Sequence, residues 1–242
     1  MSSRPKTAIV TGASQGIGAG IVNRFVERGF NVVANSRHVT QSTEVAASNR
    51  VALVDGHIGQ PATATRIVET ALSRFESIDV LVNNAGIFFA KPFTDYTAED
   101  VRSLVSTNVE GFVYITQLAI RQMLKQKTGG SIVTITAALA RNPIRGVTAA
   151  VPMITKGGLE TITRHLAMEY AKDRIRVNAV APGVVDTPMH KDDPKDVMES
   201  LSPMGRVSTV AEIADAVMYL TDAATVTGDI LYVDGGAHSG RW

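Results

Sequence analysis

The alternation of short apolar runs with longer segments is the feature that most constrains the fold of this chain. Most of the runs are continuously apolar, which is typical of parallel strands that are covered on both faces. The segments between them are long enough for the crossover helices that parallel strands require, and we expect helices there. The pattern predicts an α/β protein with one doubly wound parallel sheet of about seven strands and helices on both faces. The predicted strands are Thr7–Thr11, Asn31–Asn35, Val51–Val54, Val80–Asn83, Ser131–Thr136, Arg176–Val180 and Ile230–Val233.

Length and composition favour a single domain. The chain has 242 residues, 45% of them hydrophobic, which is enough for one large core and is near the upper limit for one. No repeat or linker divides it, so we expect one domain over residues 1–242. The segment Thr187–Ser202, rich in Asp, Lys, Met and Pro, interrupts the alternation after the sixth predicted strand. We interpret residues 187–204 as a candidate mobile lid.

Charge and residue usage exclude several classes of function. The net charge of +1 gives no indication of binding to nucleic acid or to an anionic membrane. The absence of cysteine excludes disulfides and thiolate metal sites, and the histidines lack metal-ligand spacing, so we expect no metal. No apolar run approaches the roughly 20 residues of a membrane span, and the first residues lead directly into a strand without a signal-peptide pattern. We therefore expect a soluble, cytoplasmic protein.

A glycine-rich segment, Thr11–Gly18, follows the first predicted strand and opens a helix. Glycines at this point let the backbone approach a pyrophosphate, and they place the helix N-terminus under its negative charge. The position after strand one and before a helix makes a dinucleotide site a stronger interpretation than a tight turn without a ligand.

The end of the second predicted strand indicates which dinucleotide is favoured. A carboxylate there would bind the ribose 2′-hydroxyl of NAD. The chain instead has Asn35, Ser36, Arg37 and His38, with no carboxylate to repel a 2′-phosphate. The Arg37 guanidinium could pair with such a phosphate, so Ser36 and Arg37 predict NADP(H) over NAD(H); the alternative is a solvated surface arginine.

Several motifs in register give the chain a resemblance to a known family. They are Thr11–Gly18, Asn83–Gly86, Asn108 followed by Val-Glu-Gly, Lys156, Pro182–Thr187 and Val233–Gly236. In order and spacing the chain resembles the short-chain dehydrogenases/reductases, over essentially its whole length. The resemblance implies a Rossmann fold, a nicotinamide dinucleotide cofactor and oxidoreductase activity on a small-molecule carbonyl or alcohol.

The resemblance also implies cofactor contacts. Lys156 would bond the nicotinamide ribose, and Asp55 or the backbone at Ile58 would meet the adenine, because the family's aspartate slot falls on His57. The remaining implied contacts are Gly12, Ser14, Gln15, Ile17 and Gly18 at the pyrophosphate end, Asn83, Ala85 and Gly86 beside the adenosine ribose, and Pro182, Gly183, Val185 and Thr187 at the carboxamide.

The catalytic set that the resemblance implies is incomplete. The family uses a tyrosine as proton donor, a lysine that lowers the tyrosine pKa, a serine that orients the carbonyl and an asparagine that anchors a water. Asn108 and Lys156 fill two of these positions, but Pro152 stands at the tyrosine position and Ala137 at the serine position. The loop Arg141–Val151 is also about two residues longer than usual for the family.

Two hypotheses follow from these substitutions. The chain is either an oxidoreductase with an atypical catalytic set, in which water or a lid residue such as His190 moves the proton, or a cofactor-binding pseudoenzyme that senses or scaffolds. His190 titrates in the suitable range, although a lid histidine is more often a solvated surface residue.

The segment Asp100–Lys125 carries more apolar side chains than one helix stripe requires. A helix that is apolar nearly all round is covered on more than one side. The sheet can cover one side, and a partner subunit is expected to cover another, together with the helix Pro152–Ala171. We therefore predict a homodimer or homotetramer.

Overall fold

A computed structural model of the chain describes residues 4–240 and contains one sheet of seven parallel strands. The predicted fold class and all seven predicted strands are confirmed, with ends that differ by two residues at most. The strands are β1 (Thr7–Thr11), β2 (Asn31–Ser36), β3 (Val51–Asp55), β4 (Val80–Asn83), β5 (Gly130–Ile135), β6 (Ile175–Pro182) and β7 (Ile230–Val233).

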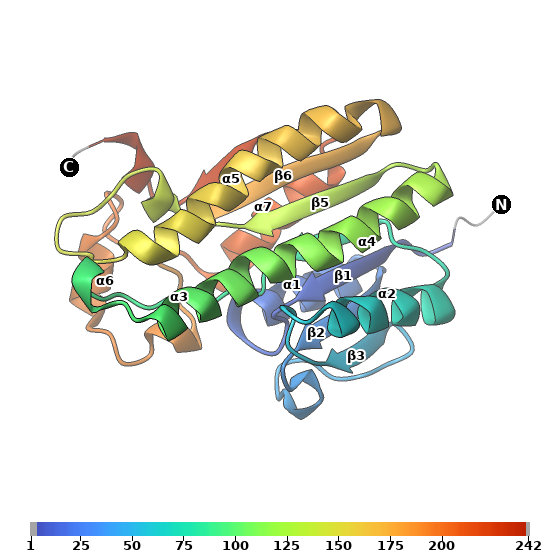
Figure 1. Cartoon of the computed structure of the whole chain (residues 1–242), viewed down its shortest axis with the longest axis horizontal. Coiled ribbons are helices and arrows are strands. Elements are labelled where there is room, and N and C mark those ends of the chain that lie inside the picture. The colour runs from blue at the N-terminus through green and yellow to red at the C-terminus, as the bar shows by residue number, and fades with distance from the viewer. Residues whose placement is uncertain (1–3, 241–242) are drawn as a thin grey trace.

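Helices cover both faces of the sheet (Figure 1). One face packs against α1 (Gly16–Glu27) and α7 (Val210–Asp222), and the other packs against α2 (Pro61–Phe75), α4 (Gly111–Gln126) and α5 (Ala150–Tyr170). Successive strand side chains point to opposite faces, so Ala8 and Val10 join the core under α1 while Ile9 joins the core under α2 and α4. The continuously apolar strands thus supply two cores, one on each face.

The connection from β2 to β3 lacks the α-helix that the alternation predicts. It contains only the 3₁₀ turn Val39–Gln41. Ser42 Oγ accepts hydrogen bonds from the backbone N–H groups of Glu44 and Val45, and Ser48 Oγ accepts from those of Arg50 and Val51. Serine hydroxyls that bond nearby backbone groups in this way compete with helix formation, which explains the difference.

The segment predicted as one helix over Asp100–Lys125 is divided into three parts. The helix α3 (Ala98–Leu104) leads into the π-helical segment Val105–Glu110, and α4 follows. A capping box formed by Thr97 and Asp100 starts α3. Single π-helical turns within α-helices often mark functional sites, and this one carries Asn108.

The strand order is β3-β2-β1-β4-β5-β6-β7, so the direction of winding reverses between β1 and β4. In doubly wound sheets, ligands bind outside the carboxyl ends of the strands at such a reversal. The loops after β1 and β4 are the glycine-rich segment and Asn84–Gly86. The loop before α5, the segment that carries α6 (Lys195–Ser200) and the C-terminal turn Ala237–Ser239 lie at the same end of the sheet (Figure 1).

Between residues 4 and 240, no helix is both long and apolar enough to cross a membrane. The candidate lid, residues 187–204, contains the 3₁₀ turn Pro188–His190 and α6. Its mobility stays a prediction.

Candidate functional site

The loops after β1 and β4 are fastened to each other by side-chain hydrogen bonds. Asn84 Nδ2 donates to the carbonyl oxygens of Thr11 and Gly12 at 2.9 and 3.0 Å, and Thr11 Oγ1 accepts from the N–H groups of Asn84 and Ala85 at 3.2 and 3.1 Å. Gly12 has a φ of +65°, and a Cβ on it would lie 2.7 Å from the Ala85 Cα. Only glycine fits this position, because any side chain would push the two loops apart.

A cavity of about 370 Å³ opens at these two loops and continues toward α5 and the candidate lid. It brings together most of the residues that the sequence implicates in cofactor binding. The implicated residues that line it are Gly12, Gln15, Ile17, Gly18, Ala85, Gly86, Ala137, Lys156, Pro182, Gly183, Val185 and Thr187.

Lys156 lies on the second turn of α5 and is the lysine among the described residues that line this cavity. Its Nζ donates to the Ile135 carbonyl oxygen at 2.8 Å, and a Cβ on Gly86 would lie 3.2 Å from the same nitrogen. Burial lowers the pKa of Lys156 to about 8, because the charged form loses its hydration. Near neutral pH this group can therefore both carry a charge and release a proton.

The depressed pKa of Lys156 predicts a stability effect. Between pH 8 and the ordinary pKa of 10.5, the unfolded chain holds a proton that the folded chain has released, so stability rises with pH across this window. Lys156→Met removes the buried charge and is expected to stabilise the cofactor-free protein by about 1–3 kcal/mol at pH 7, with the gain shrinking toward pH 10.5. Urea unfolding at several pH values measures this. A variant less stable than the parent at pH 7 would contradict the expectation.

Asn108 does not line the cavity but holds three elements together. Its Nδ2 donates to the Ile87 carbonyl oxygen and to Thr155 Oγ1 at 3.1 and 3.0 Å, and its Oδ1 accepts from the Ile87 N–H at 2.9 Å. These bonds join the π-helical segment, the loop after β4 and α5. The side chain therefore positions the cavity wall, and its role as a water anchor stays a prediction.

Ala137 and Pro152 are the residues that the resemblance assigns to the family's serine and tyrosine positions, and this assignment stays a prediction. Ala137 follows β5 and lines the cavity. Pro152 is buried in the first turn of α5, where its missing N–H leaves no hydrogen bond unmade. The neighbouring hydroxyl cannot replace the serine freely, because Thr136 Oγ1 contacts the Val180 carbonyl oxygen at 3.3 Å and Glu160 Oε1 at 3.4 Å.

The implicated residues that do not line this cavity lie in its wall, in the glycine-rich loop or near the ends of β2 and β3. Asn83 is buried and donates from Nδ2 to Thr116 Oγ1 at 3.0 Å, while the adjacent Asn84 lines the cavity. Ile58 is buried against α4, facing Gly111. Ser14, Ser36, Arg37 and Asp55 complete this group, and their contacts with a cofactor stay predictions.

Asp55 is already engaged by the connection from β2 to β3. Its carboxylate accepts hydrogen bonds from Thr40 Oγ1 and, at 2.9 Å, from the Thr40 N–H. The Thr40 hydroxyl, followed by the Thr40 N–H, holds the pKa of Asp55 below its ordinary value. An adenine amine would have to share this carboxylate with Thr40.

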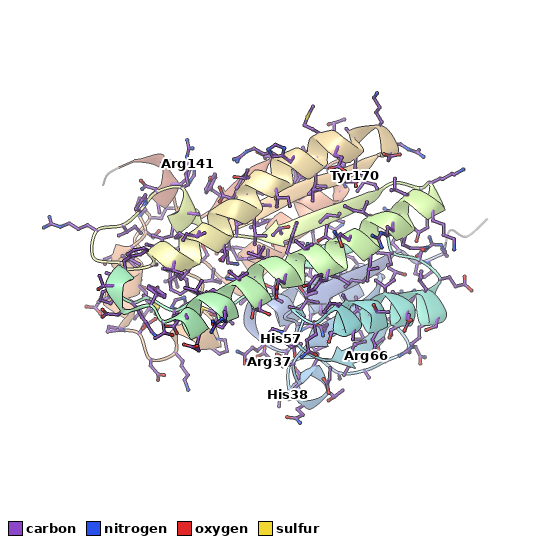
Figure 2. The ribbon with its side chains drawn as sticks, in the orientation of Figure 1. Arg37, His38, His57, Arg66, Arg141 and Tyr170 are labelled. Carbon is purple, nitrogen blue, oxygen red and sulfur yellow. The ribbon has the colours of Figure 1, made fainter. Side chains whose placement is uncertain are left out.

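Arg37 is exposed directly after β2, beside the end of β3. Figure 2 places it near His38 and His57, at the ends of these two neighbouring strands. Arg37 contributes a fixed positive charge at this end of the sheet. An anionic group on the ribose would meet at least one fixed positive charge there.

The part of the cavity beyond Ala137 contains residues that, apart from those of the candidate lid, were not assigned to the site from the sequence. Asn142 lies in the loop before α5 and donates from Nδ2 to the Ala237 carbonyl oxygen at 2.6 Å, which joins that loop to the C-terminal turn. The other residues in this part are Phe88, Leu139, Ile144, Val147, Met189, His190, Leu201 and Ala237. They come from five separate segments, so no local motif identifies them.

His190 has one ring nitrogen fixed by a carboxylate. Its Nδ1 lies 2.7 Å from Asp193 Oδ2, within the 3₁₀ turn and the residues just after it. Across residues 4–240 its Nε2 has no hydrogen-bond partner, and the side chain is a quarter exposed where it lines the cavity. Within the same range, no group of three or more His, Asp or Glu residues is arranged to hold a metal ion.

The fold and the loops at its winding reversal define a dinucleotide-binding type of α/β oxidoreductase. A family model described as enoyl-(acyl carrier protein) reductase matches residues 12–238. The chain belongs to the short-chain dehydrogenase/reductase family and is an oxidoreductase of the dehydrogenase/reductase kind.

Similar proteins span nearly the whole chain. The L-rhamnose 1-dehydrogenase (NAD(P)(+)) of Sphingomonas sp. (strain SKA58) is 33% identical, over 96% of each chain. The glucose 1-dehydrogenase of Gluconobacter oxydans (strain 621H) is 34% identical, over 96% of this chain and 91% of its own.

Solved structures agree with this assignment. The 3-ketoacyl-(acyl-carrier-protein) reductase from Brucella melitensis, complexed with NADH, has a TM-score of 0.90 at 30% identity, over 97% of this chain and 99% of its own. ElxO with NADP bound has a TM-score of 0.88 at 26% identity, over 98% and 100%.

Proposed function

We propose that the protein binds NADP(H) in the cavity at the winding reversal and interconverts an apolar carbonyl compound and its alcohol with an atypical catalytic set. The observation that carries this proposal is the continuity of the cavity. It runs from the glycine-rich loop, past Lys156 and Gly183, into a chamber lined by apolar side chains. When bound, the nicotinamide supplies or accepts the hydride.

The residues present fit a dinucleotide. Gly12 and Gly18 let the glycine-rich loop pack closely, because a Cβ on either would collide with backbone atoms of Ala85 or Gly12. The first residues of α1, which could bind a pyrophosphate through their N–H groups, line the cavity. Lys156 would hold the nicotinamide ribose, and Pro182, Gly183, Val185 and Thr187 would hold the carboxamide. The solved relatives named above contain NADH or NADP, which supports the same class of cofactor here.

The choice of NADP(H) over NAD(H) rests on Arg37. Arg37→Asp replaces a charge that would attract the 2′-phosphate with one that repels it. We expect the ratio of NADPH affinity to NADH affinity to fall by about ten- to a hundredfold. Fluorescence titration with both reduced cofactors measures the ratio. Arg102→Asp, which makes the same charge change on α3, is the control, and an unchanged ratio in Arg37→Asp would contradict the assignment.

The lining of the chamber indicates the substrate class. Leu139, Ile144, Val147, Leu201 and Phe88 line it, whereas no arginine or acidic side chain does. A phosphorylated or carboxylated substrate would find no arginine to anchor it, since the cofactor ribose would occupy Lys156 and Asp193 already pairs with His190. An apolar ketone or the corresponding alcohol fits this lining better.

His190 is the group that we propose as proton donor. Asp193 holds Nδ1 and leaves Nε2 to donate a proton to the oxygen of the carbonyl as the hydride arrives, and to take it back in the reverse reaction. The product is the alcohol, and the lost proton is replaced from solvent. Asn142 lines the same chamber and is the residue that we propose to orient this oxygen.

The loss of the usual tyrosine and serine favours a second candidate, a cofactor-binding protein without turnover. One experiment separates the two. NADPH and NADH binding is titrated directly, and NADPH oxidation is then followed with a panel of apolar ketones, imines and activated alkenes. Turnover supports the oxidoreductase, and tight binding without turnover supports the pseudoenzyme. The absence of cofactor binding would refute both.

We also propose that the protein is a homodimer or homotetramer. On α5, Ile154 and Met168 are 69% and 81% exposed, and their separation of fourteen positions places them on one side of the helix. Val101 and Val105 are exposed on the neighbouring segment. Subunit contact through this face would cover apolar surface, so light scattering at micromolar concentration should give a dimeric or tetrameric mass. A monomeric mass would contradict it.

A further inference from the structure

A carboxylate from a distant segment binds the glycine-rich loop. Glu44 Oε2 accepts a hydrogen bond from the Gly16 N–H at 3.2 Å. Two residues earlier, Ser42 Oγ donates to the Ser14 carbonyl oxygen at 2.6 Å. The adjacent Val45 is buried in the core that α1 shares with the sheet. The connection from β2 to β3 is thus anchored beside the loop, with the Glu44 carboxylate directed at its backbone.

The residue whose N–H group Glu44 occupies is part of the cavity lining. Gly16 is the first residue of α1 and lines the cavity, and a Cβ on it would lie 3.3 Å from Thr187 Cγ2 on the candidate lid. The first N–H groups of a helix have no partner within the helix, and the positive end of the helix dipole is located there. These are the groups that a dinucleotide fold offers to phosphate oxygens.

The Glu44 carboxylate has no counter-ion among the described residues. No lysine, arginine or histidine between residues 4 and 240 forms an ion pair with it, and the first turn of α1 contains no acidic residue. Glu44 therefore supplies the anion that the helix start lacks, through a carboxylate that is exposed to solvent and can rotate away.

We propose that Glu44 is an internal competitor for the cofactor phosphates and lowers the affinity for NADP(H) and NAD(H) alike. Before binding, its carboxylate satisfies the Gly16 N–H. On binding, it either leaves or stays close to a second anion, and both alternatives weaken the complex. Because Val45 anchors the backbone, rotation of the Glu44 side chain is enough for release. This inference rests on the proposed function, since it concerns the same cofactor site.

The test compares Glu44→Gln and Glu44→Ala with the parent. Affinities for NADPH, NADH and inorganic pyrophosphate are measured by titration calorimetry at low and high salt. Both variants are expected to bind each ligand about three- to thirtyfold more tightly at low salt, with the gain shrinking at high salt because the repulsion is screened. The ratio of NADPH to NADH affinity should not change, which separates this effect from that of Arg37→Asp. Glu69→Gln, the same charge change on the exposed side of α2, is the control.

The outcomes are distinct. If the cofactors bind and the Glu44 variants bind them equally or less tightly, Glu44 only caps α1 and the inference is wrong, while the proposed function stands. Thermal unfolding identifies that case, because a cap alone predicts a loss of stability in Glu44→Ala without any gain in affinity. If neither the parent nor the variants bind any nicotinamide cofactor, the proposed function fails and the inference fails with it.

Discussion

Ketone reduction is expected to accelerate when Pro152 is replaced by tyrosine and Ala137 by serine together, by at most about 10²–10⁴-fold and by less where His190 already donates the proton. Pro152 lies one helical turn before Lys156 on α5, and Ala137 already lines the cavity. A phenol at position 152 would lie near the Lys156 ammonium, which favours the phenolate and lowers the phenol pKa. A hydroxyl at position 137 would orient the carbonyl oxygen.

The measurement is single-turnover NADPH oxidation with several apolar ketones. Because Pro152 is buried, the larger side chain requires the loop before α5 to move, and the bond from Asn142 to the Ala237 carbonyl oxygen opposes this movement. The control is therefore Pro152→Phe with Ala137→Ser, which adds the same bulk without the acidic hydroxyl. NADPH affinity should change little in either variant. A parent that already turns over at about 1–10³ s⁻¹, like an ordinary enzyme, would show that it lacks no proton donor.

His190→Gln is expected to lower the parent's turnover by about 10²–10⁴-fold without weakening cofactor binding. Glutamine keeps a polar group of similar size but cannot transfer a proton. The loss should appear in the single-turnover rate and not in the affinity for NADPH. Asp193→Asn should give a smaller loss, because it removes only the group that fixes Nδ1.

The matched control is His38→Gln, which removes an exposed histidine at the adenosine end of the molecule. Adding Pro152→Tyr and Ala137→Ser to His190→Gln should restore turnover, since the phenol would replace the imidazole as donor. Equal rates for the parent and His190→Gln at every pH would assign proton transfer to water or to Lys156 instead.

The parts of the structure that local patterns determine were predictable. Mostly apolar runs predicted all seven strands, because a strand covered on both faces contains mainly apolar residues. The glycine-rich segment lies between β1 and α1, as predicted. This position could be predicted because the start of a helix after a strand depends mainly on neighbouring residues. The direction of winding, and with it the place of the cavity, follows from the fold class.

Other features depend on competition between hydrogen bonds and could not be predicted. The helix missing between β2 and β3 reflects serine side chains that bond the backbone, a choice that the spacing of apolar residues does not reveal. Asn83 and Asn84 are adjacent and identical, yet the strand's alternation buries the first against Thr116 and turns the second toward Gly12. The contact of Glu44 with Gly16 joins residues 28 positions apart, and no motif marks it.

The position of the C-terminal turn has a practical consequence for handling the protein. Ala237 lines the chamber, and its carbonyl oxygen accepts a hydrogen bond from Asn142. A purification tag fused after this turn would therefore start beside the chamber. The start of β1 and the turn Ala237–Ser239 lie at opposite ends of the sheet (Figure 1). A tag placed before β1 would extend away from the chamber. With that tag, a slow reaction would not be caused by obstruction of the chamber.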